Sequence, residues 1–435
     1  MQIKGKNFLS STDFDFKDKV VLLRIDCDVD LKEEKGQLVV DEDFRLKSVL
    51  PTIKFLQGRG VSKIIMLGHL GRPEGKPVKE LSLKPVAVWF SENFAFCELI
   101  KDISVLPGQT PVKSLLRGGR LVRRKPCLPT GRFGEGGMNS SDGGMNNLFL
   151  LENLRFDPGE EANDKNFVAG LASLAEVYVN DAFGASHRDH ASITGLAKIL
   201  PSFLGLRFEV EVKTLSWIKT KAERPLVFVL GGSKQGKLDY IPFLVNWADY
   251  LLVGGKLPLL IQNSKIPERF PSEINGVGKN QKYNSKIQIG RLKKGGRDIS
   301  QESIVNFKKI INSAATVFWA GPMGVYEEEE NRQGTFEIAK AISRLSGSFS
   351  PGVGLDSAGE KRRTDSSDGG MNNVFKIAGG GDTHRILSWL NLWHKFDFVS
   401  VGGGAALQFL KDDTLPGIEA IKNTFRHPDP AVTSG

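Results

Sequence analysis

Short runs of consecutive apolar residues recur along this chain, and each run stops abruptly at a polar residue or a glycine. The runs cover 20–26 (VVLLRID), 63–69, 148–154, 177–183, 225–232, 250–255, 316–322, 374–382 and 398–404. Strands buried on both faces have this pattern, because a strand with one face in water alternates apolar and polar residues instead. Helix-like segments such as 164–176 and 335–345 separate the runs. The sequence therefore predicts βαβ units and an α/β fold with doubly wound parallel sheets.

The length of 435 residues is too great for one hydrophobic core and predicts two domains, or three. A net charge of +9 suits an anionic partner, but the basic residues are spread along the chain, so we expect a small anion and no nucleic acid. Cys27, Cys97 and Cys127 form no CxxC pair, which argues against a disulfide framework or a zinc site. No apolar run is long enough to span a membrane. We therefore expect a cytoplasmic protein with no membrane partner.

Two segments, 115–147 and 347–373, are poor in apolar residues and rich in Gly, Ser, Arg and Lys. Both end in the same octapeptide, SSDGGMNN. Nothing else repeats with it, so a solenoid or a duplicated domain is not indicated. We interpret both segments as inserted surface loops. The octapeptide has neither metal-ligand nor catalytic spacing, and a role for it stays open.

The residues at the ends of the apolar runs differ between the two halves of the chain. The first half carries Asp26, His69, Arg72, Arg155, Asp181, His187 and Arg188, and the second half carries Gly231, Gly232, Lys234, Gly254, Gly255, Gly321, 379–381, Asp382 and 402–404. Ligands of doubly wound sheets bind beyond the carboxyl ends of the strands. Arginine suits bidentate capture of carboxylates and phosphates, whereas glycine lets backbone N–H groups approach a ligand closely. One such glycine commonly marks only a tight turn, but the feature recurs at five strand ends.

The stretch from Gly231 to Lys237 fits the phosphate-binding pattern G-x-x-x-x-G-K. The Ser or Thr that should follow the lysine is replaced by Leu238, which has nothing to offer a magnesium ion. The motif alone leaves two hypotheses open, an incomplete P-loop or a glycine loop of another kind.

Nine motifs, taken in order, resemble those of the phosphoglycerate kinase family over nearly the whole chain outside the two insertions. They are RIDCDVDL (24–31), EDFRL (42–46), HLGRPEG (69–75), LENLRF (151–156), VNDAFGASHRDHAS (179–192), LGGSK (230–234), WAGPMGVYE (319–327), GGGDT (379–383) and VGGGAALQFL (401–410). One motif alone would be weak, but nine in the family's order are specific. The resemblance implies reversible phosphoryl transfer between 1,3-bisphosphoglycerate and ADP, which gives 3-phosphoglycerate and ATP with Mg²⁺.

The resemblance also implies how the chain is divided. It implies two Rossmann-like domains joined by a hinge near 200–212, with 3-phosphoglycerate bound by residues 1–203 and the nucleotide by residues 204–412. Residues 413–435, including the LPGIEAI segment, would return to the N-terminal domain. Because the substrates lie on separate domains, catalysis requires hinge closure, which also excludes water. We expect a monomer.

Residue roles follow from the resemblance, motif by motif. The implied glycerate-binding residues are Asp26, Asp28, Arg45, His69, Arg72, Arg155 and Arg188. The implied nucleotide-binding residues are Gly231, Gly232, Lys234, Lys237, Gly254, Gly255, Pro322, Glu327, Gly379, Gly380, Gly381, Asp382 and Thr383, with Asp382 as the Mg²⁺ ligand. The implied catalytic residues are Arg45, Lys234, Gly380 and Gly403. The charged strand ends agree with these roles, because a small ligand with two anionic ends needs several guanidinium groups.

The implied mechanism needs no nucleophilic side chain, because phosphoryl transfer through a loose transition state depends on positioning and charge neutralisation. We therefore expect His69 and His187 to be hydrogen-bond donors or structural residues. The segment that resembles a P-loop would be the family's GG-x-K loop, with its magnesium ligand, Asp382, far along the chain.

The sequence departs from the family's pattern at several positions. Asp28 stands where the family has asparagine, and Ser300 stands where glycine is usual. Lys234 and Lys237 are separated by two residues instead of three, and Lys256 follows a glycine pair. Most of these changes lie on the nucleotide side. They leave open a homologue that binds ligands without turnover, and a true P-loop NTPase is a further alternative.

Overall fold

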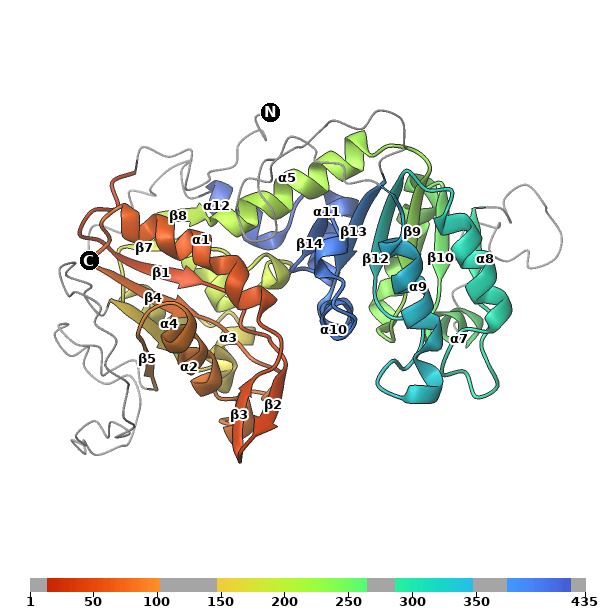
Figure 1. The fold of residues 1–435 in the computed structure, drawn as a ribbon. Coiled ribbons are helices and arrows are strands. Elements are labelled where there is room, and N and C mark those ends of the chain that lie inside the picture. Colours follow the sequence, from red (N-terminus) through yellow and green to blue (C-terminus); the bar gives the residue numbers. More distant parts are fainter. Residues whose placement is uncertain (1–13, 102–146, 264–285, 347–373, 424–435) are drawn as a thin grey trace.

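The computed structural model describes residues 14–101, 147–263, 286–346 and 374–423. In these ranges the chain forms two six-stranded sheets, one from each half of the sequence (Figure 1). All neighbouring strands in both sheets are parallel. The predicted α/β fold with two doubly wound parallel sheets is confirmed.

The N-terminal sheet has the strand order β5-β6-β4-β1-β7-β8. Its strands are β1 (Val20–Arg24), β4 (Lys63–Leu67), β5 (Cys97–Ile100), β6 (Leu148–Leu151), β7 (Val177–Asn180) and β8 (Ser202–Leu204). The chain goes from β1 to β4 on one side and later returns to β7 on the other side. The strand order therefore reverses between β1 and β7, which is where sheets of this kind bind ligands.

The C-terminal sheet has the order β11-β10-β9-β12-β13-β14, which is the order of a Rossmann sheet. Its strands are β9 (Leu226–Leu230), β10 (Tyr250–Val253), β11 (Ile287–Ile289), β12 (Thr316–Ala320), β13 (Phe375–Gly379) and β14 (Phe398–Ser400). Both β10 and β12 pair with β9, on opposite sides of it. The reversal point of this sheet therefore lies between β9 and β12, whose ends carry the GG-x-K loop and the WAGP motif.

Each of the nine predicted apolar runs contains one strand, but five other strands were not predicted. Strands β5, β8 and β11 lie at sheet edges, where β5 and β11 are partly exposed and β8 has only three residues. The remaining two, β2 (Leu31–Glu34) and β3 (Gln37–Val40), form an antiparallel hairpin that projects from the N-terminal domain. Because its residues are largely exposed, the hairpin lacks the continuous apolar run of the buried strands.

Helices connect the strands in both domains. They are α1 (Phe44–Gly58), α2 (Lys84–Asn93), α3 (Pro158–Glu161), α4 (Lys165–Ala172), α5 (Leu206–Lys221), α6 (Ile241–Trp247), α7 (Leu257–Asn263), α8 (Gln301–Ile311), α9 (Gln333–Ser343), α10 (Gly381–Trp389), α11 (Gly404–Asp412) and α12 (Pro416–Asn423). The predicted helical segments correspond to α4 and α9. The Asp164 carboxylate begins α4 by accepting hydrogen bonds from two backbone N–H groups of its first turn. None of these helices, within the described ranges, is long and apolar enough to cross a membrane.

Both faces of each sheet are buried against separate groups of apolar side chains. In β1, Leu22 packs on one side of the sheet and Leu23 on the other. In β9, Phe228 and Val229 divide in the same way. Leu22 and Phe228 belong to one continuous cluster, so apolar packing extends from one sheet to the other. This two-sided burial explains why the strands appear in the sequence as unbroken apolar runs.

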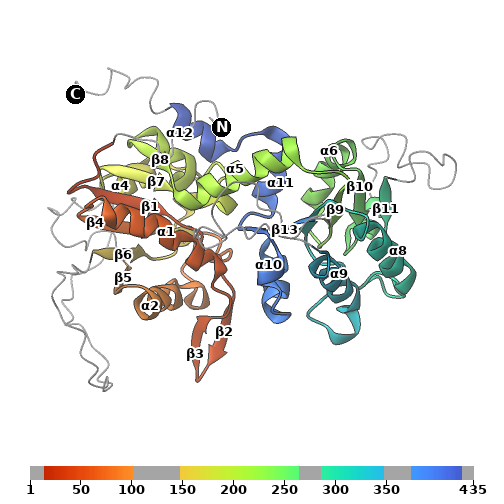
Figure 2. The same cartoon turned by 45° about the horizontal axis from the view of Figure 1, so that its top comes forward.

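Helix α5 joins the two domains and contacts both of them (Figure 1 and Figure 2). At its start, the Leu206 N–H donates to Thr52 Oγ1 of the N-terminal domain at 3.0 Å. One turn later, the buried Glu211 carboxylate accepts from Ser400 Oγ and from the Val401 N–H, both at 2.7 Å, in the C-terminal domain. The helix is therefore tied to both sheets within its first two turns.

Helix α12 lies beside the N-terminal domain, although it follows the last strand of the C-terminal sheet (Figure 2). The Gly417 N–H donates to the Ser186 carbonyl at 3.0 Å. Ile418 and Ile421 are buried, and the helix packs on the turns at Ala191–Gly195 and Leu196–Lys198. Residues 416–423 thus cover part of the first domain.

The two predicted insertions lie outside the described residues, apart from Asn147. The residues that flank the second insertion are adjacent, because the Val374 N–H donates to the Ser346 carbonyl at 3.2 Å. The core of the C-terminal domain is therefore continuous across this point.

Candidate active site

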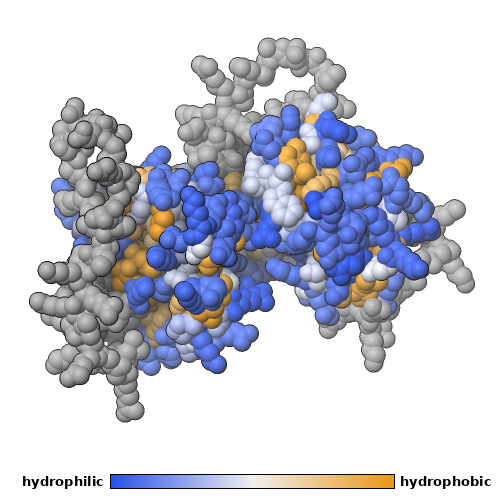
Figure 3. Space-filling model, turned by 60° about the horizontal axis from the view of Figure 1, so that its bottom comes forward, coloured by the Kyte–Doolittle hydropathy of each residue, from blue (hydrophilic) through white to orange (hydrophobic). Residues whose placement is uncertain are grey.

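The loops that follow the strands of the two sheets meet between the domains. Figure 3 shows two mostly hydrophilic lobes with a notch between them. On the N-terminal side, Gly184 follows β7, and a Cβ atom placed on it would lie 3.1 Å from the Val401 carbonyl oxygen, just after β14. The charged and the glycine-rich strand ends therefore face a common region, which we call the junction.

Asp26 follows β1 and lies close to Arg45, the second residue of α1. Arg45 Nη1 is 3.5 Å from Asp26 Oδ1 and donates to the Asp28 backbone carbonyl. The Asp28 side chain is half exposed, with Oδ2 3.9 Å from Arg45 Nη1. Its Oδ1 accepts a hydrogen bond from the Gly71 N–H at 2.9 Å. Asp28 is thus turned toward Arg45 and the HLGRPEG loop.

His69 is buried behind this edge, and its tautomer is determined by Arg24. Arg24 Nη2 lies 2.7 Å from His69 Nδ1. A guanidinium can only donate, so Nδ1 must be the unprotonated nitrogen and the proton must lie on Nε2. Burial, followed by the charges of Arg24 and Arg188, keeps the pKa of His69 well below its usual value. His69 is therefore a neutral ring with one N–H to donate.

Arg72, Arg155 and Arg188 belong to the same edge. Arg155 is buried, and its Nη1 donates to the Gly71 carbonyl at 2.7 Å. Its Nη2 is buried as well and has no hydrogen-bond partner among the described residues. Burial, together with the charge of the exposed Arg72, lowers the pKa of Arg188, so these two cations lie within range of each other. Crowded guanidinium groups with a free donor suit a ligand that carries two anionic groups.

Across the junction, the glycine loops after β9, β10 and β12 pack on one another with no space for side chains. The Gly232 N–H donates to the Pro322 carbonyl at 2.7 Å, and the Gly255 N–H donates to the Met323 carbonyl at 3.0 Å. A Cβ on Gly231 would lie 2.1 Å from Pro322 O, and one on Gly255 would lie 2.5 Å from the Gly232 nitrogen. The closest contact at each position is a backbone atom, so only glycine fits.

Two more glycines complete this surface. The Gly254 N–H donates to the Leu230 carbonyl at 2.9 Å, and a Cβ there would meet the Met323 sulfur at 2.5 Å. Gly321 has a φ of 104°, and a Cβ placed on it would lie 2.6 Å from Lys237 Nζ. The result is a surface made largely of backbone atoms, which a ligand can approach closely.

Lys237 lies beneath this surface and does not project from it as a P-loop lysine would. Its Nζ donates to the Gly231 carbonyl at 2.7 Å and to the Ala320 carbonyl at 3.0 Å. Burial lowers the pKa of Lys237 to about 8, against the opposing charge of Asp382. Leu238, the residue in place of the P-loop hydroxyl, is buried in the core. The segment is therefore a packed glycine loop, as the resemblance implies, and not a P-loop.

The GGGDT motif forms the start of α10. Gly380, with a φ of 103°, precedes the helix, and Asp382 lies exposed in its first turn. Thr383 is buried, and its Oγ1 accepts a hydrogen bond from the Gly321 N–H at 3.0 Å. The N-terminus of a helix with glycine backbone around it favours phosphate. Glu327, after β12, is exposed.

Within the described ranges, no group of three or more His, Cys, Asp or Glu side chains could hold a metal ion. A single exposed carboxylate at Asp382 nevertheless fits Mg²⁺, which proteins commonly bind through one or two carboxylates and the phosphates of a substrate.

Residues of both domains approach one another at the junction. Arg45 Nη2 lies 3.4 Å from the position that a Cβ would take on Gly381. A Cβ on Gly403 would lie 3.0 Å from the Gly380 Cα, so these two glycine loops are in contact. Lys234 is exposed, and its charge adds to burial in lowering the pKa of His187 in the other domain. The four predicted catalytic residues thus come from distant segments to one region.

Sequence reasoning missed the residues that hold His69 from behind. Arg24 Nε donates to Ser192 Oγ at 2.9 Å, and Ser192 Oγ donates to a Glu160 carboxylate oxygen at 2.6 Å. All three side chains are buried. The one available signal was an arginine inside the apolar run VVLLRID, because a charge at a buried strand position requires partners.

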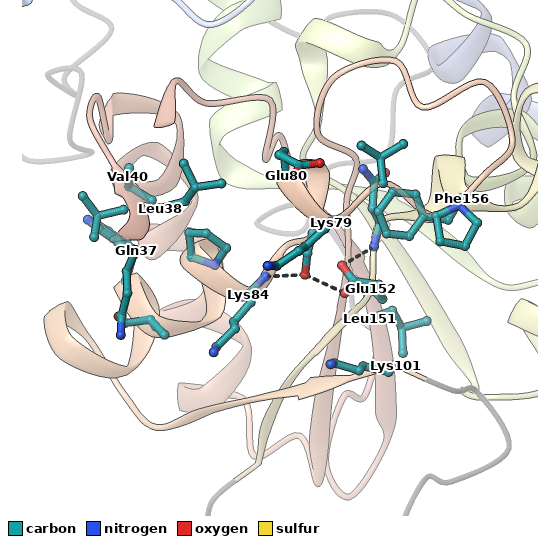
Figure 4. A pocket seen from close by; sticks show the side chains of 18 of the residues that line it. Gln37, Leu38, Val40, Lys79, Glu80, Lys84, Lys101, Leu151, Glu152 and Phe156 are labelled. Atoms are coloured by element: carbon teal, nitrogen blue, oxygen red, sulfur yellow. Dashed lines mark hydrogen bonds between the residues drawn. The ribbon is translucent and has the colours of Figure 1, made fainter. Parts of the chain in front are cut away.

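A separate cavity of about 1400 Å³ lies on the N-terminal domain between the β2–β3 hairpin, α2 and β6 (Figure 4). None of the predicted site residues lines it. In its wall, Glu152 accepts hydrogen bonds from Ser82 Oγ and the Leu83 N–H, both at 2.7 Å, so this carboxylate is already satisfied. The cavity does not belong to the junction.

Comparison with known proteins gives a consistent result. A profile of the family described as Phosphoglycerate kinase matches residues 11–118, 138–266 and 259–413. The phosphoglycerate kinase of Solibacter usitatus is 34% identical over 448 residues, covering 95% of this chain and 99% of that protein. That of Thermomicrobium roseum is 34% identical, covering 94% of this chain and 98% of that protein.

Solved structures show the same fold. The phosphoglycerate kinase of Coxiella burnetii aligns with a TM-score of 0.63 and 25% identity, covering 94% of this chain and 98% of that one. The structure from Pyrococcus horikoshii aligns with a TM-score of 0.66 and 22% identity, covering 96% of this chain and 99% of that one. With the family profile and the near full-length relatives, these likenesses place the chain in the phosphoglycerate kinase family.

Proposed function

We propose that this protein transfers a phosphoryl group reversibly between 1,3-bisphosphoglycerate and ADP, giving 3-phosphoglycerate and ATP. The position of Arg45 carries the proposal. Arg45 belongs to the charged edge of the N-terminal sheet, yet its guanidinium lies against Gly381 at the start of α10. A cation that touches both edges is well placed to act on a group that passes from one edge to the other.

The N-terminal edge binds the glycerate. A buried donor without a partner, such as Arg155 Nη2, costs free energy until an anion accepts from it. Arg72 and Arg188 supply further guanidinium donors for the carboxylate and the phosphate. His69 donates its Nε2–H as a neutral group, and Asp26 accepts from the glycerate hydroxyl.

The C-terminal edge binds the nucleotide. Its base packs on the glycine surface and on Pro322, while Glu327 accepts from the ribose hydroxyls. The phosphates lie at the start of α10, where Gly379, Gly380, Gly381 and Thr383 provide backbone and hydroxyl donors. The residues around the base are Gly231, Gly232, Gly254 and Gly255.

Mg²⁺ accompanies the nucleotide, and Asp382 would hold it together with the phosphates. When bound, the ion supplies charge neutralisation at the phosphate oxygens. Lys237 acts from below, because its ammonium already donates to two carbonyls of the loop. Its role is to keep the glycine surface in place and to add positive charge beneath the phosphates.

Arg45 and Lys234 neutralise the phosphoryl group during transfer, and the N–H groups of Gly380 and Gly403 donate to its oxygens. The attacking oxygen belongs to a carboxylate or a phosphate, which is already an anion, so no side chain has to remove a proton. This leaves His69 and His187 without a role as bases. Their lowered pKa values agree, because both rings are neutral near pH 7.

Closure of the domains brings the substrates together and excludes water. We place the hinge at 200–212, where the chain passes from β8 into α5, and the domain limits at 1–203, 204–412 and 413–435. A monomer in the cytoplasm is part of the same proposal.

A coupled steady-state assay in both directions tests the function. We expect saturable turnover that requires MgADP and 1,3-bisphosphoglycerate, or MgATP and 3-phosphoglycerate. Binding of both substrates without turnover would instead indicate a ligand-binding homologue. ATP hydrolysis that does not need 3-phosphoglycerate would indicate an NTPase. Sedimentation of the same sample tests the monomer.

A further inference from the structure

Two contacts outside the substrate-binding residues join the N-terminal domain to α10. In the first, Arg385 Nε donates to Asp30 Oδ2 at 2.9 Å, and Arg385 Nη2 pairs with Asp30 Oδ1. Asp30 lies in the loop after β1, and Arg385 lies on α10 in the other domain. Because both carboxylate oxygens are engaged, this is a bidentate ion pair, which requires a specific geometry. It connects residues 355 positions apart in the sequence.

The second contact is aromatic. Phe44, the first residue of α1, places its ring 4.7 Å from the ring of Trp393 in a stacked arrangement and 5.1 Å from the ring of His384, edge-on. The Arg207 guanidinium lies 5.4 Å from the same ring. An N-terminal side chain thus sits in a socket made of two C-terminal residues and one residue of α5. Aromatic and cation–π contacts of this kind depend on orientation as well as distance.

Both contacts lie directly beside the proposed catalytic residues. Phe44 precedes Arg45, so the socket fixes the point from which the Arg45 side chain extends. Arg385 lies three residues after Asp382, nearly one turn along the same helix. Asp30 lies two residues after Asp28, in the loop whose carbonyl accepts from Arg45. In the same region, Arg45 Nη2 lies 3.4 Å from the position that a Cβ would take on Gly381.

We propose that Asp30, Arg385 and Phe44 are positioning residues that form an interdomain clamp, which holds Arg45 against the first turn of α10. This inference rests on the proposed phosphoryl transfer. None of the three residues needs to touch a substrate. The clamp acts by limiting the angles between the domains, so a larger share of the bound substrates is aligned for transfer.

If the clamp aligns the bound substrates, the turnover number should depend on it and the KM values should not. Loss of the ion pair leaves both substrate-binding edges intact, so the KM of each substrate should stay within about twofold. The turnover number should fall, because fewer bound complexes have Arg45 in place. The two side chains are 29% and 37% exposed, so the effect should be moderate, about three- to tenfold.

Four variants test the ion pair: Asp30→Asn, Arg385→Gln, Arg385→Lys, and the charge swap Asp30→Arg with Arg385→Asp. We expect the two neutral variants to lower kcat about three- to tenfold, and the swap to recover at least half of the loss on a logarithmic scale. The kcat of Arg385→Lys should lie between those of the wild type and the neutral variants, because lysine keeps the charge but cannot form the bidentate contact. Arg224→Gln is the control, because Arg224 pairs with Asp249 at 3.1 Å inside one domain, with the two side chains 48% and 36% exposed.

Small-angle scattering of the substrate-free proteins provides a readout that does not need activity. We expect a larger radius of gyration for Asp30→Asn and Arg385→Gln than for the wild type and for Arg224→Gln, with recovery in the charge swap. If the wild type is inactive, the proposed function fails, and the scattering alone still decides whether a clamp exists.

Phe44→Leu and Phe44→Tyr test the socket. Tyrosine keeps the ring and should retain kcat within about twofold, whereas leucine keeps apolar bulk without the stacking and should lower kcat several-fold. The clamp is overturned by an unchanged kcat or an unchanged radius of gyration in both neutral ion-pair variants. A charge swap that behaves no better than the single variants also overturns it.

Discussion

The two edges of the junction are built in opposite ways. The N-terminal edge consists of polar and charged side chains that are held in place by other side chains, as Arg24 holds His69. The C-terminal edge uses the backbone itself, because Gly231 and Gly255 leave no space for a side chain. The specificity of the N-terminal edge therefore depends on side chains that a substitution can remove. The specificity of the C-terminal edge depends on the conformation of the backbone.

Because the two edges differ in this way, the same kind of substitution should act differently on each of them. Removal of a cationic head group from the N-terminal edge should reduce binding or turnover and leave the fold intact. Addition of one methyl group to the C-terminal edge should disturb the backbone, and with it both stability and nucleotide binding. The predictions below test this contrast, in order of decreasing effect.

The largest effect should come from Arg45 and Lys234, the charges proposed to act on the phosphoryl group. Arg45→Ala and Lys234→Ala should each lower kcat on the order of a hundredfold or more, because each removes charge stabilisation from a closed site. Lys47→Ala is the control, because Lys47 lies two residues after Arg45 with its side chain 59% exposed. Steady-state kinetics with both substrates saturating provide the measurement. Losses below about threefold in both variants would remove these residues from the chemistry.

On the glycine surface of the C-terminal edge, Gly231→Ala should destabilise the fold as well as weaken nucleotide binding. The new Cβ would lie 2.1 Å from Pro322 O and 2.7 Å from Gly321 O, so backbone must move. We expect the free energy of unfolding to fall by about 1–3 kcal/mol and the KM for MgATP to rise on the order of tenfold. Denaturant unfolding and kinetics measure the two effects.

Gly236→Ala is the matched control for this substitution. Gly236 lies in the same loop, but a Cβ there would have nothing within 4 Å. Its unfolding and its kinetics should match those of the wild type. Equal effects of the two substitutions would show that the loop, and not the close contact, determines the outcome.

A smaller effect is expected at Asp28, whose charge lies on the N-terminal edge. Asp28→Asn keeps an oxygen for the Gly71 N–H and removes a negative charge 3.9 Å from Arg45. We expect the KM for 3-phosphoglycerate to fall about two- to fivefold at low ionic strength, and the gain to shrink with added salt. Asp28→Ala also loses the hydrogen bond, so it should not show the same gain. A KM that rises in the asparagine variant would mean that the carboxylate serves to hold Arg45.

Almost no effect is expected from the second insertion. Ser346 and Val374 are hydrogen-bonded to each other, so a short Gly-Ser linker can replace residues 347–373 without moving β13. Loop length alone costs little free energy. The shortened protein should unfold and turn over like the wild type, and a loss of substrate affinity would place this segment in the site. The same replacement of residues 115–147 is expected to be equally silent.

The fold could be predicted from the sequence wherever strands are buried on both faces. Strands such as β1 and β9 are unbroken apolar runs, because each face meets its own group of apolar side chains. The β2–β3 hairpin has no such signal, since its residues are largely exposed. The turn at Lys35 and Gly36, where φ is 50° and 75°, left only a single glycine as a clue.

The site could be predicted residue by residue only through motifs, and the motifs say nothing about contacts between domains. The pair of Asp30 and Arg385 spans nearly the whole chain, and neither residue stands out in composition or spacing. The burial of Lys237 beneath its own loop was also unpredictable, because it depends on where the β12 carbonyls lie. Such contacts become visible only once the two sheets are placed.

The central claim is that the charged edge binds the glycerate and the glycine edge binds the nucleotide. Calorimetric titration of 3-phosphoglycerate and of MgADP, each alone, into the wild type, Arg72→Ala and Gly231→Ala tests it directly. We predict that Arg72→Ala weakens the binding of 3-phosphoglycerate about tenfold or more and leaves the affinity for MgADP unchanged. Gly231→Ala should weaken the binding of MgADP and leave the affinity for 3-phosphoglycerate unchanged. If both substitutions weakened both ligands equally, or if the two ligands exchanged edges, the division of the junction into these two edges would be contradicted.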